Sequence, residues 1–454
     1  MIDTELKFCE NDLNEIIRLF DDGKDLPVRH LYSRKEDRVV NTIVVGGRSY
    51  AYGNLVGTFS DEIVEKRIIK RYAKLSLYKA LSTHFNKTMP WGALTGIRPT
   101  KLAYQQLEES GEFLDFFINT MKVSREKATL IQSVLDNQKG IYSTDGASTD
   151  LFVFIPFCPT RCKYCSFISA DLKSAKPYVN QYVDALIKEI EDGAKYVKNL
   201  RSIYVGGGTP VSLDNENLEK VLRCIDKINT GVEFTVEAGR PDVITKENLA
   251  LLKKYRVTRI CVNPQTFNDK TLTLLGRNHT GEQVIRAYEL CKDDFSVNMD
   301  LIAGLEGESF EDFKKSIDTA ISLSPDNVTV HTLCIKKGSA LAKDNVRLDD
   351  GDVEKMVNYA RESLVNAGYG PYYLYRQKYM AGNFENVGYS KKGKECVYNI
   401  DVMEETTSVV ACGANAISKR VMGERIERYA SPKDVKTYIE KLPVILQSKG
   451  LLFK

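Results

Sequence analysis

The strongest constraint on the fold is an alternation of short apolar segments with longer amphipathic ones that starts at Leu151. The short segments are rich in β-branched and aromatic residues, so we predict strands at Leu151–Ile155, Ser202–Val205, Glu233–Val236, Arg259–Val262, Val297–Ile302 and Asn327–His331. Helical spacing of apolar residues predicts helices at Tyr178–Lys198, Asn215–Asn229, Thr245–Lys254, Glu282–Lys292 and Phe310–Leu323. Strands joined by helices imply right-handed βαβ units and a parallel sheet. Because a closed eight-fold barrel usually takes about 250 residues, these six strands predict an α/β fold with a partial (β/α)6 barrel.

The regions on either side of this alternation differ from it. Residues 1–147 predict an α+β domain, with a strand at Arg38–Val45 and a helix at Asp61–Phe85. The segment Met89–Thr100 is rich in Gly and Pro and holds the only Trp, so it is either a packed loop with an aromatic anchor or a docking or ligand-contact segment. We assign residues 148–345 to the barrel and 346–454 to a smaller C-terminal α/β extension that covers the substrate, with a closing helix near Lys433–Gln447.

Charge and apolar patterning exclude several classes of partner. Sixty-four Lys and Arg against 61 Asp and Glu leave a net charge of +3, too little to predict nucleic acid or an anionic membrane as the main partner. The sequence has no run of about 18 apolar residues, the length expected of a transmembrane segment. The N-terminus has no signal-peptide pattern. We therefore expect a cytoplasmic protein, and in a reducing compartment clustered cysteines more often bind metal or do chemistry than form disulfides.

Three of the ten cysteines, Cys158, Cys162 and Cys165, fall within eight residues after the first barrel strand. A structural zinc site needs four closed ligands, and no fourth Cys or His follows within forty residues. A redox disulfide would use only two of the thiols. A cluster of four irons with three of them ligated explains the triple better, because thiolates hold iron–sulfur clusters. The remaining seven cysteines are expected to be buried thiols.

The Cys-x-x-x-Cys-x-x-Cys spacing, with Tyr164 before the third cysteine, resembles the radical SAM superfamily. The resemblance implies that Cys158, Cys162 and Cys165 ligate a 4Fe-4S cluster whose open iron chelates the amino and carboxylate groups of S-adenosyl-L-methionine (SAM). It also implies that SAM is cleaved to a 5′-deoxyadenosyl radical. In that family the segment Gly206–Thr209 contacts the methionine moiety, and glycines suit such a contact because they let the backbone approach a ligand closely.

Polar residues near the ends of later strands supply what SAM requires, namely acceptors for its amino group and ribose and a cation for its carboxylate. The candidate cofactor-binding residues are thus Gly206, Gly207, Gly208, Thr209, Glu237, Gln265, Arg277 and Asp300. The family's contacts to a second SAM map only loosely onto Val409–Ser418, so one SAM is predicted and a second is left open.

Within the superfamily the chain resembles the oxygen-independent coproporphyrinogen III oxidase branch, and most closely its HemZ-type dehydrogenases. The strings that carry this resemblance are Trp91–Pro99, Val262–Phe267, Gly276–Thr280 and Tyr375–Tyr389. It implies anaerobic oxidative decarboxylation of two coproporphyrinogen III propionates to vinyls in heme biosynthesis, with an electron donor and an electron acceptor as partners. Two departures keep an alternative open: Phe167 stands where the oxidases often have a fourth cysteine, and Phe152-Val153-Phe154 replaces Tyr-x-His.

The alternative is a heme chaperone of the same branch, which keeps the cluster and delivers heme to a client. His279 and His331, at strand ends, are then either structural residues or axial ligands. For a substrate with four carboxylates, cations are expected at the barrel mouth, and the candidates are Lys336, Lys337, Arg376, Lys378, Lys391 and Lys392. No catalytic residue and no oligomeric state is assigned from the sequence.

Overall fold

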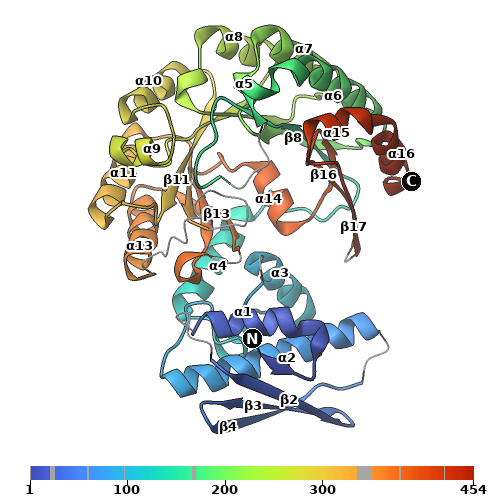
Figure 1. Cartoon of the computed structure of the whole chain (residues 1–454), viewed down its shortest axis with the longest axis vertical. Coiled ribbons are helices and arrows are strands. Elements are labelled where there is room, and N and C mark those ends of the chain that lie inside the picture. The colour runs from blue at the N-terminus through green and yellow to red at the C-terminus, as the bar shows by residue number, and fades with distance from the viewer. Residues whose placement is uncertain are drawn as a thin grey trace. The chain divides into compact units, whose positions relative to one another are not determined.

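The computed structural model describes residues 2–20, 26–58, 61–96, 98–165, 170–334, 350–377, 380–423 and 425–454. They form two compact units (Figure 1). Unit 1 contains Met1–Gln132, Arg376–Lys378 and Gly382–Phe384, and unit 2 contains Ser133–Tyr375, Tyr379–Ala381 and Glu385–Lys454. Two short pieces of the C-terminal region therefore belong to the N-terminal unit. The boundaries suggested by the sequence, after residues 147 and 345, fall inside unit 2.

Unit 1 is built on a four-stranded sheet in the order β1-β2-β3-β4. Its strands are β1 (Asp3–Thr4), β2 (Val28–Lys35), β3 (Arg38–Val45) and β4 (Arg48–Leu55), the last three antiparallel. Alternate residues of β3 are buried, which gives the sheet one core face. Helix α2 (Glu62–Phe85) packs against β3, and α1 (Glu10–Arg18) packs against α2. Helices α3 (Pro99–Ser110) and α4 (Arg125–Gln138) follow, α4 running into unit 2.

The loop that holds the only Trp is a packed anchor. Trp91 is fully buried, and the guanidinium of Arg376 lies 4.9 Å from its ring centroid. Arg376, 3% exposed, donates hydrogen bonds to the carbonyl oxygens of Leu94 and Asn383. Gly92 has a φ of +52°, and a Cβ there would overlap the backbone of Lys122. Two segments nearly 300 residues apart in the chain thus complete one core.

Unit 2 contains an eleven-stranded sheet in the order β13-β14-β12-β11-β10-β9-β8-β5-β15-β16-β17. Six neighbouring strands are parallel and follow one another in sequence: β5 (Thr149–Ile155), β8 (Leu200–Gly207), β9 (Glu233–Gly239), β10 (Arg259–Val262), β11 (Ser296–Ala303) and β12 (Asn327–Thr332). The predicted partial (β/α)6 arrangement is confirmed. All six carboxyl ends lie at one edge of the sheet, which we call the site edge.

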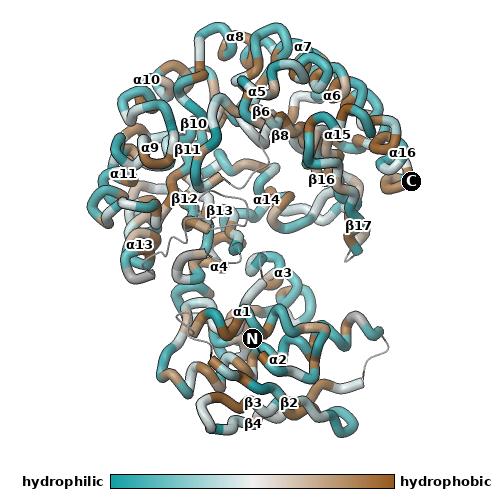
Figure 2. The backbone as a smooth tube through the Cα atoms, in the orientation of Figure 1, coloured by the Kyte–Doolittle hydropathy of each residue, from teal (hydrophilic) through white to brown (hydrophobic). Residues whose placement is uncertain are grey.

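Helices cover the outer face of this sheet (Figure 1). They are α6 (Val179–Gly193), α7 (Asn215–Asp226), α8 (Lys246–Lys254), α9 (Asp269–Leu274), α10 (Gly281–Cys291), α11 (Phe310–Leu323) and α13 (Asp350–Asn366). Side-chain caps begin several of them, as where Thr245 and Asn248 form a capping box at α8. In Figure 2 strands such as β8 and β12 are mostly hydrophobic, while the surrounding helices alternate between hydrophilic and hydrophobic turns, which is the pattern of helices packed on a buried sheet.

The C-terminal region extends the sheet on both sides. Strand β14 (Asn386–Ser390) pairs antiparallel with β12, and β13 (Gly370–Tyr375) pairs with β14. On the other side β15 (Ser408–Cys412) pairs parallel with β5 and is followed by β16 (Ile417–Met422) and β17 (Arg425–Ala430). Helix α14 (Val397–Glu404) contacts β8 and β13 and lies on the side of the sheet opposite the helices (Figure 1), which we call the inner face.

The predicted closing helix is two helices, α15 (Val435–Glu440) and α16 (Leu442–Leu452). The break falls before Pro443, which cannot continue a helix from the preceding turn. Lys449 of α16 is buried and pairs with Glu189 of α6 at 2.6 Å, which joins the last helix to α6. Within the described ranges, no helix combines the length and the apolar character needed to cross a membrane.

We expect Arg376→Leu to weaken unit 1. The substitution leaves the buried carbonyl oxygen of Leu94 and the half-buried one of Asn383 without their donor, which costs about 2–4 kcal/mol of unfolding free energy. Urea unfolding followed by Trp91 fluorescence measures this directly, because the only Trp lies in the affected core. Arg286→Leu, at a side chain 69% exposed, is the control and should change the transition little. An unchanged Arg376→Leu midpoint contradicts the role of Arg376 in this core.

Candidate cofactor site

The three motif cysteines lie in one loop at the site edge. Cys158 ends the short strand β6 (Phe157–Cys158), and Cys162 and Cys165 follow, all three half-buried. The Thr209 hydroxyl is 3.6 Å from the Cys158 sulfur, and Arg277 Nη1 is 3.9 Å from the Cys162 sulfur. Residues 166–169, including Phe167 at the fourth-cysteine position, lie outside the described part of the chain.

The glycine segment after β8 locks this loop in place. Gly208 N–H donates to the Ile155 carbonyl at 2.8 Å, and Thr209 N–H donates to the Phe157 carbonyl at 2.7 Å. A Cβ on Gly208 would stand 2.5 Å from that Phe157 oxygen, so no larger residue fits. On the other side of the loop Lys163 N–H donates to the Leu275 carbonyl at 3.0 Å. The predicted residues Gly208 and Thr209 therefore lie directly against the start of the cysteine loop.

Glu237 is held on the inner face by the preceding strand. The Tyr204 hydroxyl donates to Oε1 at 2.7 Å, and the Gly207 N–H donates to Oε2 at 3.2 Å. Gly206 leaves room for this carboxylate, because a Cβ there would come within 2.8 Å of its carbon. Burial raises the pKa of Glu237 to about 7, and the charge of Asp300 adds to that rise against the two hydrogen bonds. Glu237 can thus change protonation near neutral pH.

Gln265 and Asp300 are brought together at the ends of β10 and β11. Gln265 N–H donates to the Asp300 carbonyl at 3.0 Å, and Gln265 adopts a φ of +56°. Strain of this kind in a non-glycine residue is common at functional sites. The Gln265 side chain is 8% exposed, and its Oε1 has no hydrogen-bond partner in the described chain. Burial would raise the pKa of Asp300, yet hydrogen bonds and charge from His331 hold that pKa below its ordinary value.

Arg277 is buried beside the cysteine loop, 6% exposed. It donates from Nη1 to the Tyr164 hydroxyl at 3.0 Å and from Nη2 to the Asn263 carbonyl at 2.7 Å. Its Nε has no hydrogen-bond partner among the described residues. The structure therefore brings the predicted residues together as Cys158 with Thr209, Cys162 with Arg277, Gly207 with Glu237, and Gln265 with Asp300.

At the site edge Arg240 carries no sequence motif that would have singled it out, whereas His279 and His331 were predicted as either structural residues or axial ligands. Arg240, 3% exposed, donates to the Thr160 hydroxyl of the cysteine loop and is held by Asp242 at 2.6 Å. His279 is buried, neither ring nitrogen has a hydrogen-bond partner in the described chain, and burial with the charge of Arg277 lowers its pKa to about 4. It is therefore neutral at physiological pH. His331 lies 3.8 Å from Asp300.

Aromatic rings occupy the inner face beside Glu237. Tyr398 of α14 stacks on Tyr204 with ring centroids 4.5 Å apart and on Phe152 at 5.9 Å. All three remain half-buried. Phe152 has no hydroxyl, and the phenol that reaches a carboxylate on this face comes instead from Tyr204, on the neighbouring strand.

The predicted mouth cations are not supported where they can be described. The predictions for Lys391 and Lys392 were wrong. Strand β14 runs antiparallel to β12, so its end at Ser390 pairs with Asn327, at the amino end of the barrel strand. Lys391 donates to the Ser324 carbonyl there, at 2.6 Å. The prediction for Arg376 was also wrong, since Arg376 is buried in unit 1 against Trp91. The predictions for Lys336, Lys337 and Lys378 fall outside the described residues.

The segment predicted to match a second SAM, Val409–Ser418, forms β15 and the start of β16. Gly413 follows β15 at the site edge, and its N–H donates to the buried Glu189 at 2.7 Å. Of the seven other cysteines, six are buried and Cys334 is half-buried, which agrees with their expected role as core thiols.

The residues at the site edge fit the cofactors that the sequence motif implies. In the described ranges no three His, Cys, Asp or Glu side chains converge on a point that would hold a single metal ion. A four-iron cluster does not need such a point, because each thiolate binds a different iron. The Arg277 guanidinium lies 3.9 Å from the Cys162 sulfur, its Nε has no partner among the described residues, and buried polar atoms ordinarily have partners. Three thiols with an orphaned polar group beside them suit a cluster with a polar ligand.

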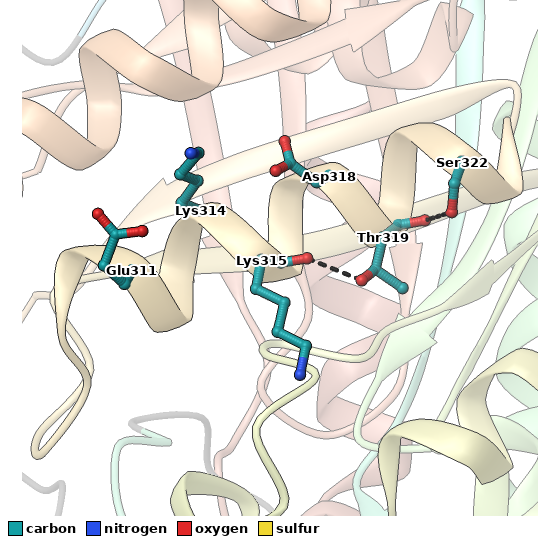
Figure 3. Close-up of a pocket in the computed structure, with 6 residues that line it drawn as sticks. All are labelled: Glu311, Lys314, Lys315, Asp318, Thr319 and Ser322. Carbon is teal, nitrogen blue, oxygen red and sulfur yellow. Dashed lines mark hydrogen bonds between the residues drawn. The ribbon is translucent and has the colours of Figure 1, made fainter.

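A separate depression runs along α11 (Figure 3) and is lined by Glu311, Lys314, Lys315, Asp318, Thr319 and Ser322. All six residues come from one helix. Thr319 and Ser322 use their hydroxyls to bond carbonyl oxygens of that same helix. This is an open polar helix surface on the outer side of the sheet, and it holds none of the predicted site residues.

Comparisons with known proteins agree with this geometry. A family model described as the radical SAM superfamily matches residues 152–320. The chain is 36% identical over 408 residues to the oxygen-independent coproporphyrinogen-III oxidase-like protein HemZ of Bacillus subtilis (strain 168), covering 84% of this chain and 81% of that protein. It is 35% identical over 193 residues to the heme chaperone HemW of the same organism, covering 41% of this chain and 50% of that protein.

Among solved structures, the chain is similar to the coproporphyrinogen III oxidase HemN from Escherichia coli, a radical SAM enzyme. The TM-score is 0.55 and the identity 21%, and the match covers 71% of this chain and 74% of that chain. This likeness shows the fold.

We expect Cys158→Ala, Cys162→Ala and Cys165→Ala each to abolish the visible iron–sulfur absorption of anaerobically reconstituted protein, because a cubane with two protein ligands is poorly held. Iron content per chain and the absorption spectrum measure this. Cys334→Ala is the matched control, since Cys334 is equally half-buried but lies outside the loop. A wild-type spectrum in any one of the three variants refutes that ligand.

Proposed function

We propose a function from one premise: the chain belongs to the radical SAM superfamily and, within it, to the family of the oxygen-independent coproporphyrinogen-III oxidase-like protein HemZ. Members of this superfamily use a 4Fe-4S cluster and SAM. We propose that this protein is a radical SAM oxidoreductase that decarboxylates two propionates of coproporphyrinogen III to vinyls without oxygen, giving protoporphyrinogen IX. The observation that carries the proposal is the extent of the HemZ match, which covers 84% of the chain.

The chemistry needs a radical. A propionate β-carbon carries a strong C–H bond that acid–base groups alone do not break, and SAM with a reduced cluster would supply the 5′-deoxyadenosyl radical that can break it. Each propionate then loses CO₂ and one further electron as the vinyl forms. An external electron acceptor takes that electron, and an external donor reduces the cluster.

In this proposal the chain's own residues bind and orient the two ligands. Cys158, Cys162 and Cys165 hold the cluster, and Gly206–Thr209 lies beside it to contact the methionine part of SAM. Glu237, Gln265 and Asp300 offer acceptors for the amino group and ribose of SAM, and Arg277 offers a cation to its carboxylate. The half-buried rings of Phe152, Tyr204 and Tyr398 offer a flat apolar surface of the kind that a tetrapyrrole stacks on.

The alternative is a heme chaperone, which the 35% identity to HemW over part of the chain favours. That match covers 41% of the chain, against 84% for HemZ. The histidine geometry supports an enzyme over a chaperone. His331 already has Asp300 and Tyr375 as partners, and His279 is buried.

The test is an anaerobic product assay. Reconstituted protein is incubated with a reductant, SAM, an electron acceptor and coproporphyrinogen III, and the porphyrins are separated by chromatography and weighed by mass spectrometry. We expect vinyl products with two molecules of 5′-deoxyadenosine for each protoporphyrinogen, because two hydrogen atoms are removed. Cys158→Ala is the inactive control. Stoichiometric heme binding without vinyl products contradicts the enzyme and favours the chaperone.

A second prediction concerns pH. If the ionised Glu237 accepts a hydrogen bond from the amino group of SAM, binding competes with protonation of a carboxyl whose pKa is about 7. Affinity should then rise with pH below that pKa, by up to about tenfold per pH unit, and level off above it. Isothermal titration between pH 6 and pH 8 measures the slope. Glu237→Gln cannot titrate, so the slope should shrink, and an equal slope in both proteins contradicts the contact.

A further inference from the structure

The two oxygens of the Asp300 carboxylate face two different side chains of the inner face. Asn298 Nδ2 donates to Oδ1 at 2.7 Å, and His331 Nε2 lies 3.8 Å from Oδ2. Asn298 and His331 each contact a further residue in turn. Asp300 is therefore the end point of two chains of contacts that start in the C-terminal hairpin β13–β14.

The first chain runs through the imidazole. The Tyr375 hydroxyl, at the end of β13, is 3.2 Å from His331 Nδ1. The Tyr375 contact holds Nδ1 on its own side of the ring and leaves Nε2 facing Asp300. Tyr375 thereby helps to orient the His331 ring toward the carboxylate.

The second chain runs through neutral groups. The Tyr373 hydroxyl donates to Thr329 Oγ1 at 3.2 Å, and Thr329 donates to Asn298 Oδ1 at 3.1 Å. Asn298 then donates to Asp300 from its other amide atom. Every donor in this chain points toward the carboxylate, an arrangement in which each bond polarises the next.

Both tyrosines must reach across a strand to do this. Strand β14 lies between β13 and β12, and Gly388 is in register with Tyr373 on one side and Thr329 on the other. A Cβ on Gly388 would overlap the Tyr373 ring, so only glycine lets the ring cross. The two tyrosine rings are stacked, 6° from parallel with centroids 6.3 Å apart.

We propose that Tyr373 and Tyr375 are positioning residues that hold Asp300 as a fixed hydrogen-bond acceptor for the ribose hydroxyls of bound SAM. This rests on the proposed function, in which Asp300 contacts the nucleoside. A carboxylate with one oxygen fixed by a hydrogen bond and the other facing a histidine keeps its remaining lone pairs in set directions, which suits the paired hydroxyls of a ribose. Because these contacts order the Asp300 side chain before SAM binds, less conformational entropy is lost on binding.

The test measures binding of S-adenosylhomocysteine, which cannot turn over, to cluster-reconstituted full-length protein by equilibrium dialysis. Tyr373→Phe and Tyr375→Phe should each weaken binding about fivefold, the worth of one typical hydrogen bond. In an Asp300→Asn background the same substitutions should have no further effect, because both chains act through the carboxylate. Tyr369→Phe is the control: its hydroxyl bonds the Pro325 carbonyl at 2.6 Å, away from Asp300, and binding should not change.

A fivefold loss that persists in the Asp300→Asn background overturns the proposal, because a merely structural role is indifferent to the carboxylate. Unchanged binding in both tyrosine variants, with Asp300→Asn weakened, also overturns it and leaves the proposed function intact. Failure of the wild-type protein to bind the nucleoside, despite full iron content, overturns the proposed function itself. Rescue of His331→Ala binding by His331→Gln, which restores a donor, supports the first chain.

Discussion

Two backbone hydrogen bonds, from Gly208 to Ile155 and from Thr209 to Phe157, determine where the rest of the site lies. They join the end of β8 to the start of the cysteine loop and place Thr209 beside Cys158. The contact is possible only because Gly208 has no side chain. Strand β8 also pairs with β9, and its residues Tyr204 and Gly207 donate hydrogen bonds to Glu237 of β9. The same strand therefore fixes both the cysteine loop and Glu237. The thiols and the first carboxylate are thus one rigid assembly.

The two carboxylates of the inner face differ in protonation because their surroundings differ. Glu237 receives two neutral donors and is otherwise desolvated, so its pKa rises to about 7. Asp300 is also buried, but His331 and Asn298 hold its pKa below the ordinary value. The charge on Asp300 in turn raises the pKa of Glu237. One group can therefore donate or accept a hydrogen bond near neutral pH, while the other accepts only, which is how two like side chains take different roles in one site.

The sequence predicts the parallel core and the local motifs well, for physical reasons. The strands of the core are buried on both sides and read as apolar runs, and the cysteine triple and glycine triplet depend on spacing within a few residues. Contacts between segments that are distant in the chain produce no local sequence pattern. Nothing local marks β15 as the neighbour of β5, or shows that β14 reverses direction and moves Lys391 to the far end of the sheet. The crossing of Tyr373 over Gly388 depends on a register between two strands, which periodicity does not reveal.

The C-terminal region therefore does more than extend the barrel. The radical SAM match ends at residue 320, yet β14 and β15 pair with the two outermost strands of the parallel core and leave neither with an open edge. The same region supplies Tyr398 to the aromatic face, and Tyr373 and Tyr375 to Asp300. In the proposed function the superfamily core carries the residues that hold the cluster and the nucleoside, and strands beyond it contact the side chains around Asp300. Relatives that share the core but differ after β12 can thus keep the same cofactor chemistry and still differ in the substrate or role that it serves.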